Sequence, residues 1–254
     1  MPFKSPMVVI PTYNEAENLA PLCESVLAFS EGFSILVVDD ASPDGTGPIA
    51  DRLAQKYPGR LRVLHRPMKQ GLGPAYRAVF AEALSGPSEA ILQMDADFSH
   101  PISLLPVLLA SLENHDFALA SRYIDGGVVK DWAWSRRWLS RGANFFARNT
   151  LGLSVRDLTG GFKAYRREVV EYLQQTPADS KGYFFQIETS ARALAAGFKA
   201  VEVPFIFQER MRGISKISGN LIGEAFWKTL RLRKILSQAP QRPVNDCDRG
   251  LDRA

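Results

Sequence analysis

Two aspartates one residue apart stand directly after an apolar run near the middle of the chain. The run covers residues 90–94, and Asp95 and Asp97 follow it, ahead of Ser99-His100-Pro101. Carboxylates at the end of a buried parallel strand lie at the edge where open α/β sheets bind ligands, and their oxygens suit hard cations such as Mg²⁺. Asp-x-Asp also occurs in surface turns, where the carboxylates only cap a helix. The pattern predicts a site for a divalent cation and a diphosphate, with helix capping as the competing explanation.

Two more polar motifs follow earlier apolar runs. Pro11-Thr12-Tyr13-Asn14-Glu15 comes after the run at residues 7–10, and Asp39-Asp40-Ala41-Ser42-Pro43-Asp44-Gly45-Thr46 comes after the run at residues 34–38. Carboxylates in these positions can accept hydrogen bonds from a nucleobase and a ribose, and Tyr13 can lie against the base. Either motif alone could be a helix cap. Three such motifs on strand ends of one sheet predict a nucleotide-binding crevice.

The elements that must position these motifs alternate between strand-length apolar runs and helical patterns. We expect strands, separated by helices, at residues 7–10, 34–38, 61–64, 90–94 and 117–120. This alternation is typical of βαβ units and predicts an α/β fold with a mostly parallel central sheet flanked by helices. Beyond residue 122 the rhythm changes, and we expect helices over residues 132–151, 186–196 and 221–236 and a strand near residues 199–203.

Size, charge and cysteine content narrow the class of protein. With 254 residues and 46% hydrophobic side chains, the chain can form one large domain, expected over residues 1–237 with a disordered tail at 238–254. Arginine and lysine crowd residues 136–234, which favours phosphate-bearing substrates or an anionic membrane surface. Nucleic acid is not an expected partner, because the basic residues flank acidic clusters and form no continuous stripe.

The compartment can also be predicted from the sequence. Two cysteines form no disulfide framework and fit a reducing cytoplasm. No stretch approaches the length of a membrane span, and the first residues lack the apolar core of a signal peptide. We therefore expect a cytoplasmic protein that is soluble or bound peripherally to a membrane.

Taken together, the motifs resemble those of the dolichol-phosphate (polyprenol-phosphate) mannosyltransferases, inverting members of glycosyltransferase family 2 with a GT-A fold. The resemblance covers roughly residues 5–225. It implies a GT-A catalytic domain. Together with the change of rhythm after residue 122 and the spacing of apolar and basic residues near the C-terminus, it leads us to expect a nucleotide-sugar half at residues 1–122, an acceptor half at 123–220 and an amphipathic basic helix at 221–237. Beside the two motifs described above, the resemblance rests on Gly71-Leu72-Gly73, Asp95-Ala96-Asp97, Ser99-His100, Ser121-Arg122-Tyr123 and Gly161-Phe162-Lys163.

For the sugar donor, the resemblance implies contacts at the matching positions. The diphosphate and a divalent cation, Mg²⁺ or Mn²⁺, would be held at Asp95, Ala96 and Asp97, with the two aspartates as metal ligands. Ser99 stands where some relatives have a glutamine as a further ligand. The guanosine pocket would consist of Pro11, Tyr13, Glu15, Val38 and Asp40, and a loop with Arg210 and Lys216 would close over the diphosphate.

For the acceptor, the resemblance implies that Arg122, Arg136 and Ser140 handle a phosphate group. A phosphomonoester, with a second pKa of about 6, is already largely dianionic near neutral pH, so no general base is required. Catalysis would then depend on charge stabilisation and orientation by Asp97, Arg122, Arg210 and Lys216. His65 and His100 are expected to be structural.

The implied reaction moves mannose from GDP-mannose to a polyprenyl phosphate at the cytoplasmic face of a membrane, where the protein binds peripherally, with or without a separate membrane-anchoring subunit. Trp132, Trp134 and Trp138 lie near several arginines and have the character of an interfacial segment, although core packing would also explain them. The basic helix at residues 221–236 has the same two interpretations. Two other functions stay open: the same fold with UDP-glucose, another donor or a soluble acceptor, and a non-catalytic nucleotide-binding module.

Overall fold

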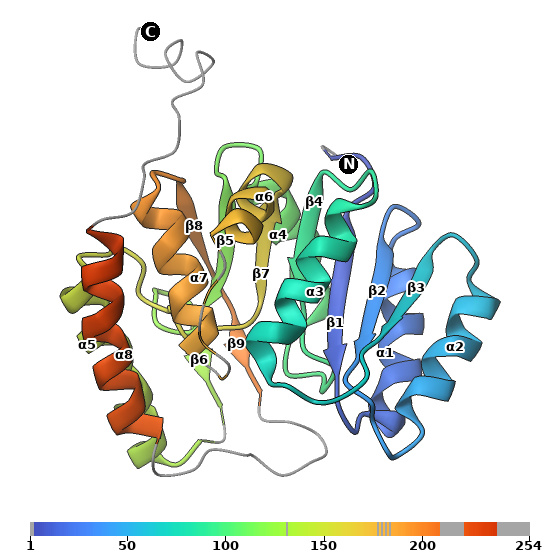
Figure 1. Cartoon of the computed structure of the whole chain (residues 1–254), viewed down its shortest axis with the longest axis horizontal. Helices are drawn as coiled ribbons and strands as arrows, with labels where there is room; N and C mark the ends of the chain where they lie inside the picture. The colour runs from blue at the N-terminus through green and yellow to red at the C-terminus, as the bar shows by residue number, and fades with distance from the viewer. Residues whose placement is uncertain are drawn as a thin grey trace, which may run out of the picture.

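A seven-stranded sheet forms the middle layer of the molecule (Figure 1). The structure is a computed structural model that describes residues 3–130, 132–176, 178, 180, 182, 184–208 and 221–237, with all side chains in these ranges except those of residues 72 and 221–224. The strand order is β3-β2-β1-β4-β7-β5-β8, in which β7 is antiparallel to its neighbours β4 and β5 and the other pairs are parallel. The strands are β1 (Met7–Thr12), β2 (Ser34–Asp39), β3 (Leu61–His65), β4 (Ala90–Gln93), β5 (Phe117–Ser121), β7 (Lys163–Arg166) and β8 (Ala200–Pro204).

Helices cover both faces of this sheet, and each face has its own apolar core. Alternate strand residues point to opposite faces, so Val9 and Leu36 pack in one core while Val8 and Ile35 pack in the other. The first core is covered by α3 (Leu72–Leu84), α6 (Arg167–Gln175) and α7 (Phe184–Ala195), and the second by α1 (Ala16–Phe29), α2 (Thr46–Lys56) and α4 (Leu105–Ser111), which follows the 3₁₀ turn η1 (Ile102–Leu104).

Two further helices lie side by side at the β8 end of the sheet, at the side of the molecule opposite α2 (Figure 1). They are α5 (Trp134–Leu151) and α8 (Leu221–Leu236), and the rings of Phe146 and Phe226 stack between them with centroids 5.0 Å apart. Within the described residues, no helix is both long enough and apolar enough to cross a membrane.

A small second sheet lies beside the larger one and consists of β6 (Val128–Val129) paired in parallel with β9 (Ile206–Phe207). It follows the ends of β5 and β8, whose last residues Ser121 and Pro204 are register partners. Trp132 packs edge-on against Phe207, with ring centroids 5.4 Å apart. This pair of short strands therefore forms a wall next to the carboxyl ends of β5 and β8.

The predicted α/β fold with a mostly parallel sheet is confirmed, and each strand expected from an apolar run is present within one or two residues of its predicted ends. The helix expected at residues 132–151 begins at Trp134, and the one expected at 221–236 is α8. Strand β7 and helix α6 were not predicted. Strand β7 has the sequence Lys-Ala-Tyr-Arg, which offers no apolar run despite its central position.

The centre of the sheet contains a lysine that water does not reach. Lys163, the first residue of β7, is completely buried, and its Nζ donates to the carbonyl of Gln186 at 2.8 Å and to Ser190 Oγ at 2.9 Å. Burial lowers the pKa of Lys163 to about 7, although Asp157 opposes the shift. Both acceptors lie on α7, so this side chain ties the sheet to that helix.

Lys163→Met should make stability less dependent on pH. The lysine has a pKa of about 7 in the native state and about 10.4 in the unfolded chain, so the unfolded state binds more protons between these values. The free energy of unfolding of the parent protein should therefore rise with pH there, by at most about 1.4 kcal/mol per pH unit for this group. Urea denaturation from about pH 7 to about pH 8.5, below the ordinary pKa of cysteine, measures the difference.

The matched control is Lys199→Met, which removes an exposed lysine just before β8. Its stability should follow the parent protein across the pH range. Equal pH slopes for the parent and Lys163→Met would show that the buried amine keeps an ordinary pKa.

Candidate active site

Three loops at the carboxyl edge of the sheet contain the acidic motifs, and each has a backbone in the left-handed region. The residues with positive φ are Asn14 after β1, Ala41 after β2 and Phe98 after β4, at 60°, 55° and 61°. Within the described chain, the only other non-glycine residue of this kind is Ser5. Residues other than glycine rarely adopt this backbone conformation, because it is strained for them, and strain of this kind is concentrated at functional sites. The shapes of these loops are therefore imposed by the surrounding contacts.

The loops after β1 and β2 are tied together by hydrogen bonds. Asp44 accepts from the backbone N–H groups of Ala16 and Thr46, both at 3.0 Å, and Thr46 Oγ1 accepts from the N–H of Glu15 at 2.9 Å. Desolvation alone would raise the pKa of the Asp44 carboxyl, but hydrogen bonds from the Thr46 hydroxyl and from the N–H groups of Ala16 and Thr46 hold it below its ordinary value. The N-cap of helix α1 is Glu15, whose side chain makes no capping bond. The loop after β2 supplies the cap instead.

Four of the five predicted nucleoside-pocket residues lie on or just after the paired ends of β1 and β2. Pro11 and Val38 are register partners, and the Asp40 N–H donates to the Thr12 carbonyl at 3.1 Å. Glu15 accepts from Asn18 Nδ2 at 2.8 Å, one turn along α1. The structure thus brings these positions to one edge of the sheet.

Two basic residues from the loop after β3 also enter this pocket, and sequence reasoning missed both. Arg66 forms a buried ion pair with Asp40, and the Lys69 ammonium lies 3.5 Å from the centre of the Tyr13 ring. Burial raises the pKa of the Asp40 carboxyl above its ordinary value, against the opposing effect of Arg66. One face of the Tyr13 ring is therefore covered by a cation.

The Asp95-Ala96-Asp97 segment is fixed in place by its own loop. The Asp95 N–H donates to Nδ1 of His100 at 3.0 Å, and the His100 ring stacks on Phe162 with centroids 4.6 Å apart. Burial lowers the pKa of His100, which keeps the ring neutral so that Nδ1 can accept. Asp97 Oδ1 accepts from the N–H and the hydroxyl of Ser99, at 3.1 and 2.6 Å. His100 and Ser99 thus position the two aspartates.

The two carboxylates differ in exposure. The side chain of Asp95 is 43% exposed, whereas Asp97 is 5% exposed. A Cβ at Gly161 would lie 3.6 Å from Asp95 Oδ1, so the loop before β7 passes directly beside this carboxylate. Within the described residues, no group of three histidine, cysteine or acidic side chains is arranged to hold a metal ion.

Arg122, predicted to handle the acceptor phosphate, is buried in an ion pair. Its Nε and Nη2 donate to the two oxygens of Asp157 at 2.7 and 2.8 Å, and Nη2 also donates to Thr159 Oγ1 at 2.8 Å. Burial alone would raise the pKa of Asp157, but the Arg122 guanidinium holds it below its ordinary value. Asp157 was also missed, although a buried arginine must have such a partner.

The other two predicted acceptor residues lie close to the same place. The Arg136 guanidinium carbon lies 4.0 Å from the centre of the Trp132 ring, and Ser140 Oγ accepts from the Tyr123 hydroxyl at 2.6 Å. Arg122 lies 5.3 Å from the Tyr123 ring and 5.6 Å from the Trp132 ring. The structure therefore gathers all three residues around two aromatic rings. The predicted loop residues Arg210 and Lys216 lie outside the described part of the chain.

The chain is similar to several known proteins in sequence and in fold. The chain matches the model for glycosyl transferase family 2 over residues 7–173. It is 47% identical over 228 residues to polyprenol monophosphomannose synthase of Mycolicibacterium smegmatis, covering 89% of this chain and 86% of that protein. Glucosyl-3-phosphoglycerate synthase from Mycobacterium tuberculosis, solved with Mn²⁺, UDP and glucosyl-3-phosphoglycerate, superposes with a TM-score of 0.66 at 17% identity, covering 95% of this chain and 82% of that one. A mannosyltransferase from Pyrobaculum calidifontis, solved with GDP-Man and Mn²⁺, gives 0.60 at 17% identity over 94% and 65% of the two chains.

The sheet, its flanking helices and the acidic loops at one edge define a GT-A glycosyltransferase fold. The chain belongs to glycosyl transferase family 2, as the sequence motifs predicted.

Asp157→Asn should strongly destabilise the protein. The substitution leaves the Arg122 charge buried without a counter-charge, and removing one partner of such a pair costs about 3–5 kcal/mol. Chemical denaturation monitored by circular dichroism measures the loss, with Asp125→Asn in an exposed loop as the control. A loss no larger than that of the control would mean that the pair does not hold this half of the site together.

Proposed function

We propose that this chain transfers mannose from GDP-mannose to a polyprenyl phosphate, with inversion at the sugar carbon. The observation that carries the proposal is the position of Asp95-Ala96-Asp97, which begins two residues after the last residue of β4, at the edge of the sheet where β1 and β2 also end. The similarity to polyprenol monophosphomannose synthase supports the choice of sugar and acceptor.

On the donor side, Asp95 and Asp97 would hold a divalent cation, Mg²⁺ or Mn²⁺, together with the diphosphate. Their donor set fits, because carboxylate oxygens suit these ions and Ser99 fixes one oxygen of Asp97 through two hydrogen bonds. Diphosphate oxygens and water would complete the coordination. A cation there neutralises charge on the departing phosphate. Arg210 and Lys216 would bind the diphosphate from the opposite side.

The nucleoside would occupy the pocket formed by Pro11, Tyr13, Glu15, Val38 and Asp40. A base stacked on the face of Tyr13 that Lys69 covers would displace the Lys69 ammonium, and that cation could then bind a phosphate. Arg66 keeps Asp40 in position to accept from the base or the ribose. Guanine and uracil could both use these contacts, so uridine nucleotide sugars have to be tested as donors beside GDP-mannose.

On the acceptor side, Arg122, Arg136 and Ser140 would orient the lipid phosphate for direct displacement. The phosphate is its own nucleophile near neutral pH, which is why this half of the site needs cations and no general base. Because Asp157 fixes Arg122 rigidly, the guanidinium would act as a pre-positioned charge. An acceptor with a polyprenyl tail stays in a bilayer, so the protein would work peripherally at the cytoplasmic face, alone or with an anchoring subunit.

The reaction can be tested directly with purified protein, Mg²⁺ or Mn²⁺, short-chain polyprenyl phosphate in detergent and a panel of radiolabelled nucleotide sugars. We expect label in the organic phase with GDP-mannose alone. Label from UDP-glucose would overturn the donor assignment, and label only in soluble products would overturn the lipid acceptor. Binding of GDP-mannose with no transfer to any acceptor would favour a non-catalytic module.

Asp97→Asn should abolish most transfer while leaving the fold intact. The amide can still accept from Ser99, but it lacks the negative charge that a cation requires. Losing even about 3 kcal/mol of transition-state stabilisation corresponds to about a hundredfold in rate. Transfer rate, Mn²⁺ titration in the presence of GDP and thermal unfolding would be measured together, with Asp125→Asn as the matched control. Parent-like turnover and Mn²⁺ affinity in Asp97→Asn would contradict the metal assignment.

A further inference from the structure

Helix α5 presents a continuous stripe of aromatic and basic side chains. Trp134, Trp138, Arg141, Phe145 and Arg148 are spaced four, three, four and three residues apart, which places them on one line along the helix. Trp134, Trp138 and Phe145 are 75%, 66% and 62% exposed. Large apolar side chains that gather on an exposed surface mark an interaction site. A binding partner for this stripe would have to offer both apolar surface for the aromatic rings and negative charge for the arginines.

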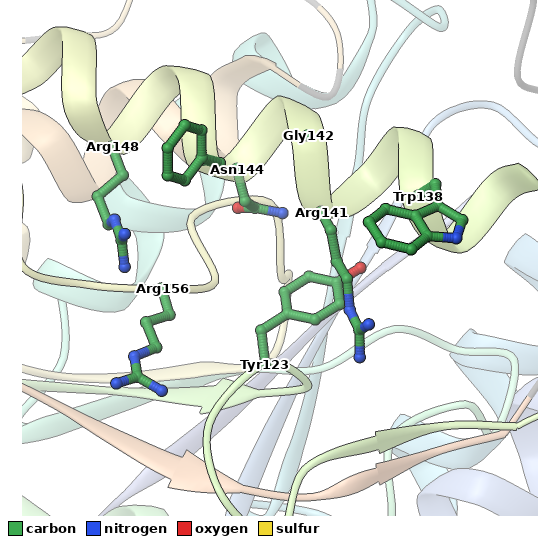
Figure 2. A pocket seen from close by; sticks show the side chains of 8 residues that line it. Tyr123, Trp138, Arg141, Gly142, Asn144, Arg148 and Arg156 are labelled. Atoms are coloured by element: carbon green, nitrogen blue, oxygen red, sulfur yellow. The ribbon is translucent and has the colours of Figure 1, made fainter.

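A groove of about 470 Å³ lies along this stripe. Three arginines line it, two from α5 and one, Arg156, from the loop that follows the helix (Figure 2). Within the described residues, the side chains of Arg141, Arg148 and Arg156 have no ion pair with a carboxylate, in contrast to Arg122 and Arg167. The rest of the lining consists of Tyr123, Trp138, Gly142, Asn144 and Phe145. The groove thus combines uncompensated positive charge with aromatic surface.

The groove is separate from the acceptor residues of the proposed active site. Arg122, Arg136 and Ser140 do not line it. Tyr123 stands between the two places: its hydroxyl donates to Ser140, and its ring lies 5.8 Å from the Arg141 guanidinium carbon. A ligand in the groove would therefore lie next to the acceptor site without occupying it.

Helix α8 adds further exposed aromatic and basic side chains at the same end of the molecule. Trp227 and Leu230 are 71% and 38% exposed, and Arg231 and Lys234 are exposed beside them. Because α5 and α8 lie side by side, with Phe146 stacked on Phe226, the two exposed surfaces belong to one end of the molecule (Figure 1). Tryptophans and arginines in this combination are typical of segments that lie in the headgroup region of a bilayer.

We propose that the groove binds the phosphate headgroup of an anionic phospholipid of the membrane, with the α5 aromatic side chains inserted at the boundary between headgroups and acyl chains. The inference rests on the proposed function in one respect, namely that the acceptor lies in a bilayer. Charge complementarity selects the occupant: three arginines that pair with no carboxylate among the described residues match a negatively charged phosphate, and the exposed rings match the apolar layer below it. The enzyme would then present its acceptor residues to the same membrane surface.

Vesicle co-sedimentation of the full chain tests the site without any turnover. The parent protein is compared with Arg148→Gln/Arg156→Gln on phosphatidylcholine vesicles with and without phosphatidylglycerol. The control Arg52→Gln/Lys199→Gln removes the same charge from exposed positions on α2 and before β8. On anionic vesicles we expect the groove variant to bind about thirtyfold more weakly, from two cations near the surface, and the control to lose much less. Circular dichroism verifies that both variants fold.

Several results would overturn the proposal. Equal binding of the parent protein to neutral and anionic vesicles would exclude a headgroup site, and equal losses in the two double variants would reduce the effect to overall charge. Transfer to short-chain polyprenyl phosphate in detergent is the second measurement. Unchanged transfer by Arg148→Gln/Arg156→Gln supports a separate lipid site, and a loss there as large as on vesicles would assign these arginines to the acceptor itself. If the parent protein transfers no sugar at all, the proposed function fails while the vesicle comparison still decides this site.

Discussion

The Arg122 guanidinium is a buried cation. A buried charge of this kind is stable only beside an opposite charge that is itself held in place. Asp157 is that partner, and its loop is fixed from two sides. Glu202 on β8 accepts the N–H groups of Arg156 and Asp157 at 2.8 and 2.9 Å, and Asn144 on α5 accepts the N–H of the next residue at 2.8 Å. A single ion pair thereby joins the end of β5, the edge strand β8 and the helix that carries the aromatic stripe.

The antiparallel strand β7 determines how the proposed donor and acceptor halves of the site meet. Because β7 runs against β4 and β5, its first residue, Lys163, pairs with Gln93 at the end of β4 and with Leu119, two residues before the end of β5. The segment Thr159-Gly160-Gly161 therefore enters the site between them. Gly161 passes Asp95, while Thr159 Oγ1 accepts from Arg122 at 2.8 Å. A Cβ at Gly160 would lie 3.2 Å from a β5 carbonyl, so the tight passage favours glycine. Both halves share one short connection.

Local patterns in the sequence predicted most of the fold, because buried parallel strands appear as apolar runs. Strand β7 was not predicted, because it begins with Lys163. The acceptors that accommodate this buried amine lie on a helix that comes later in the chain. The same limit applied to the site. The acidic motifs could be recognised in the sequence. The ion pairs of Arg122 with Asp157 and of Asp40 with Arg66 could not, because they join residues 35 and 26 positions apart. No local pattern encodes which distant residue balances a buried charge.

The strained loops after β1 and β2 have a further consequence for ligand recognition. Hydrogen bonds from the backbone N–H groups of Asn14, Glu15 and Ala16 to the side chains of Ser42, Thr46 and Asp44 hold the two loops together. Their shape therefore does not depend on a bound nucleotide. Ordering a loop on binding weakens affinity through lost conformational entropy. Here that loss occurs once, during folding, and a nucleoside bound as proposed would meet a pre-organised backbone, with adjustment confined to side chains such as Lys69.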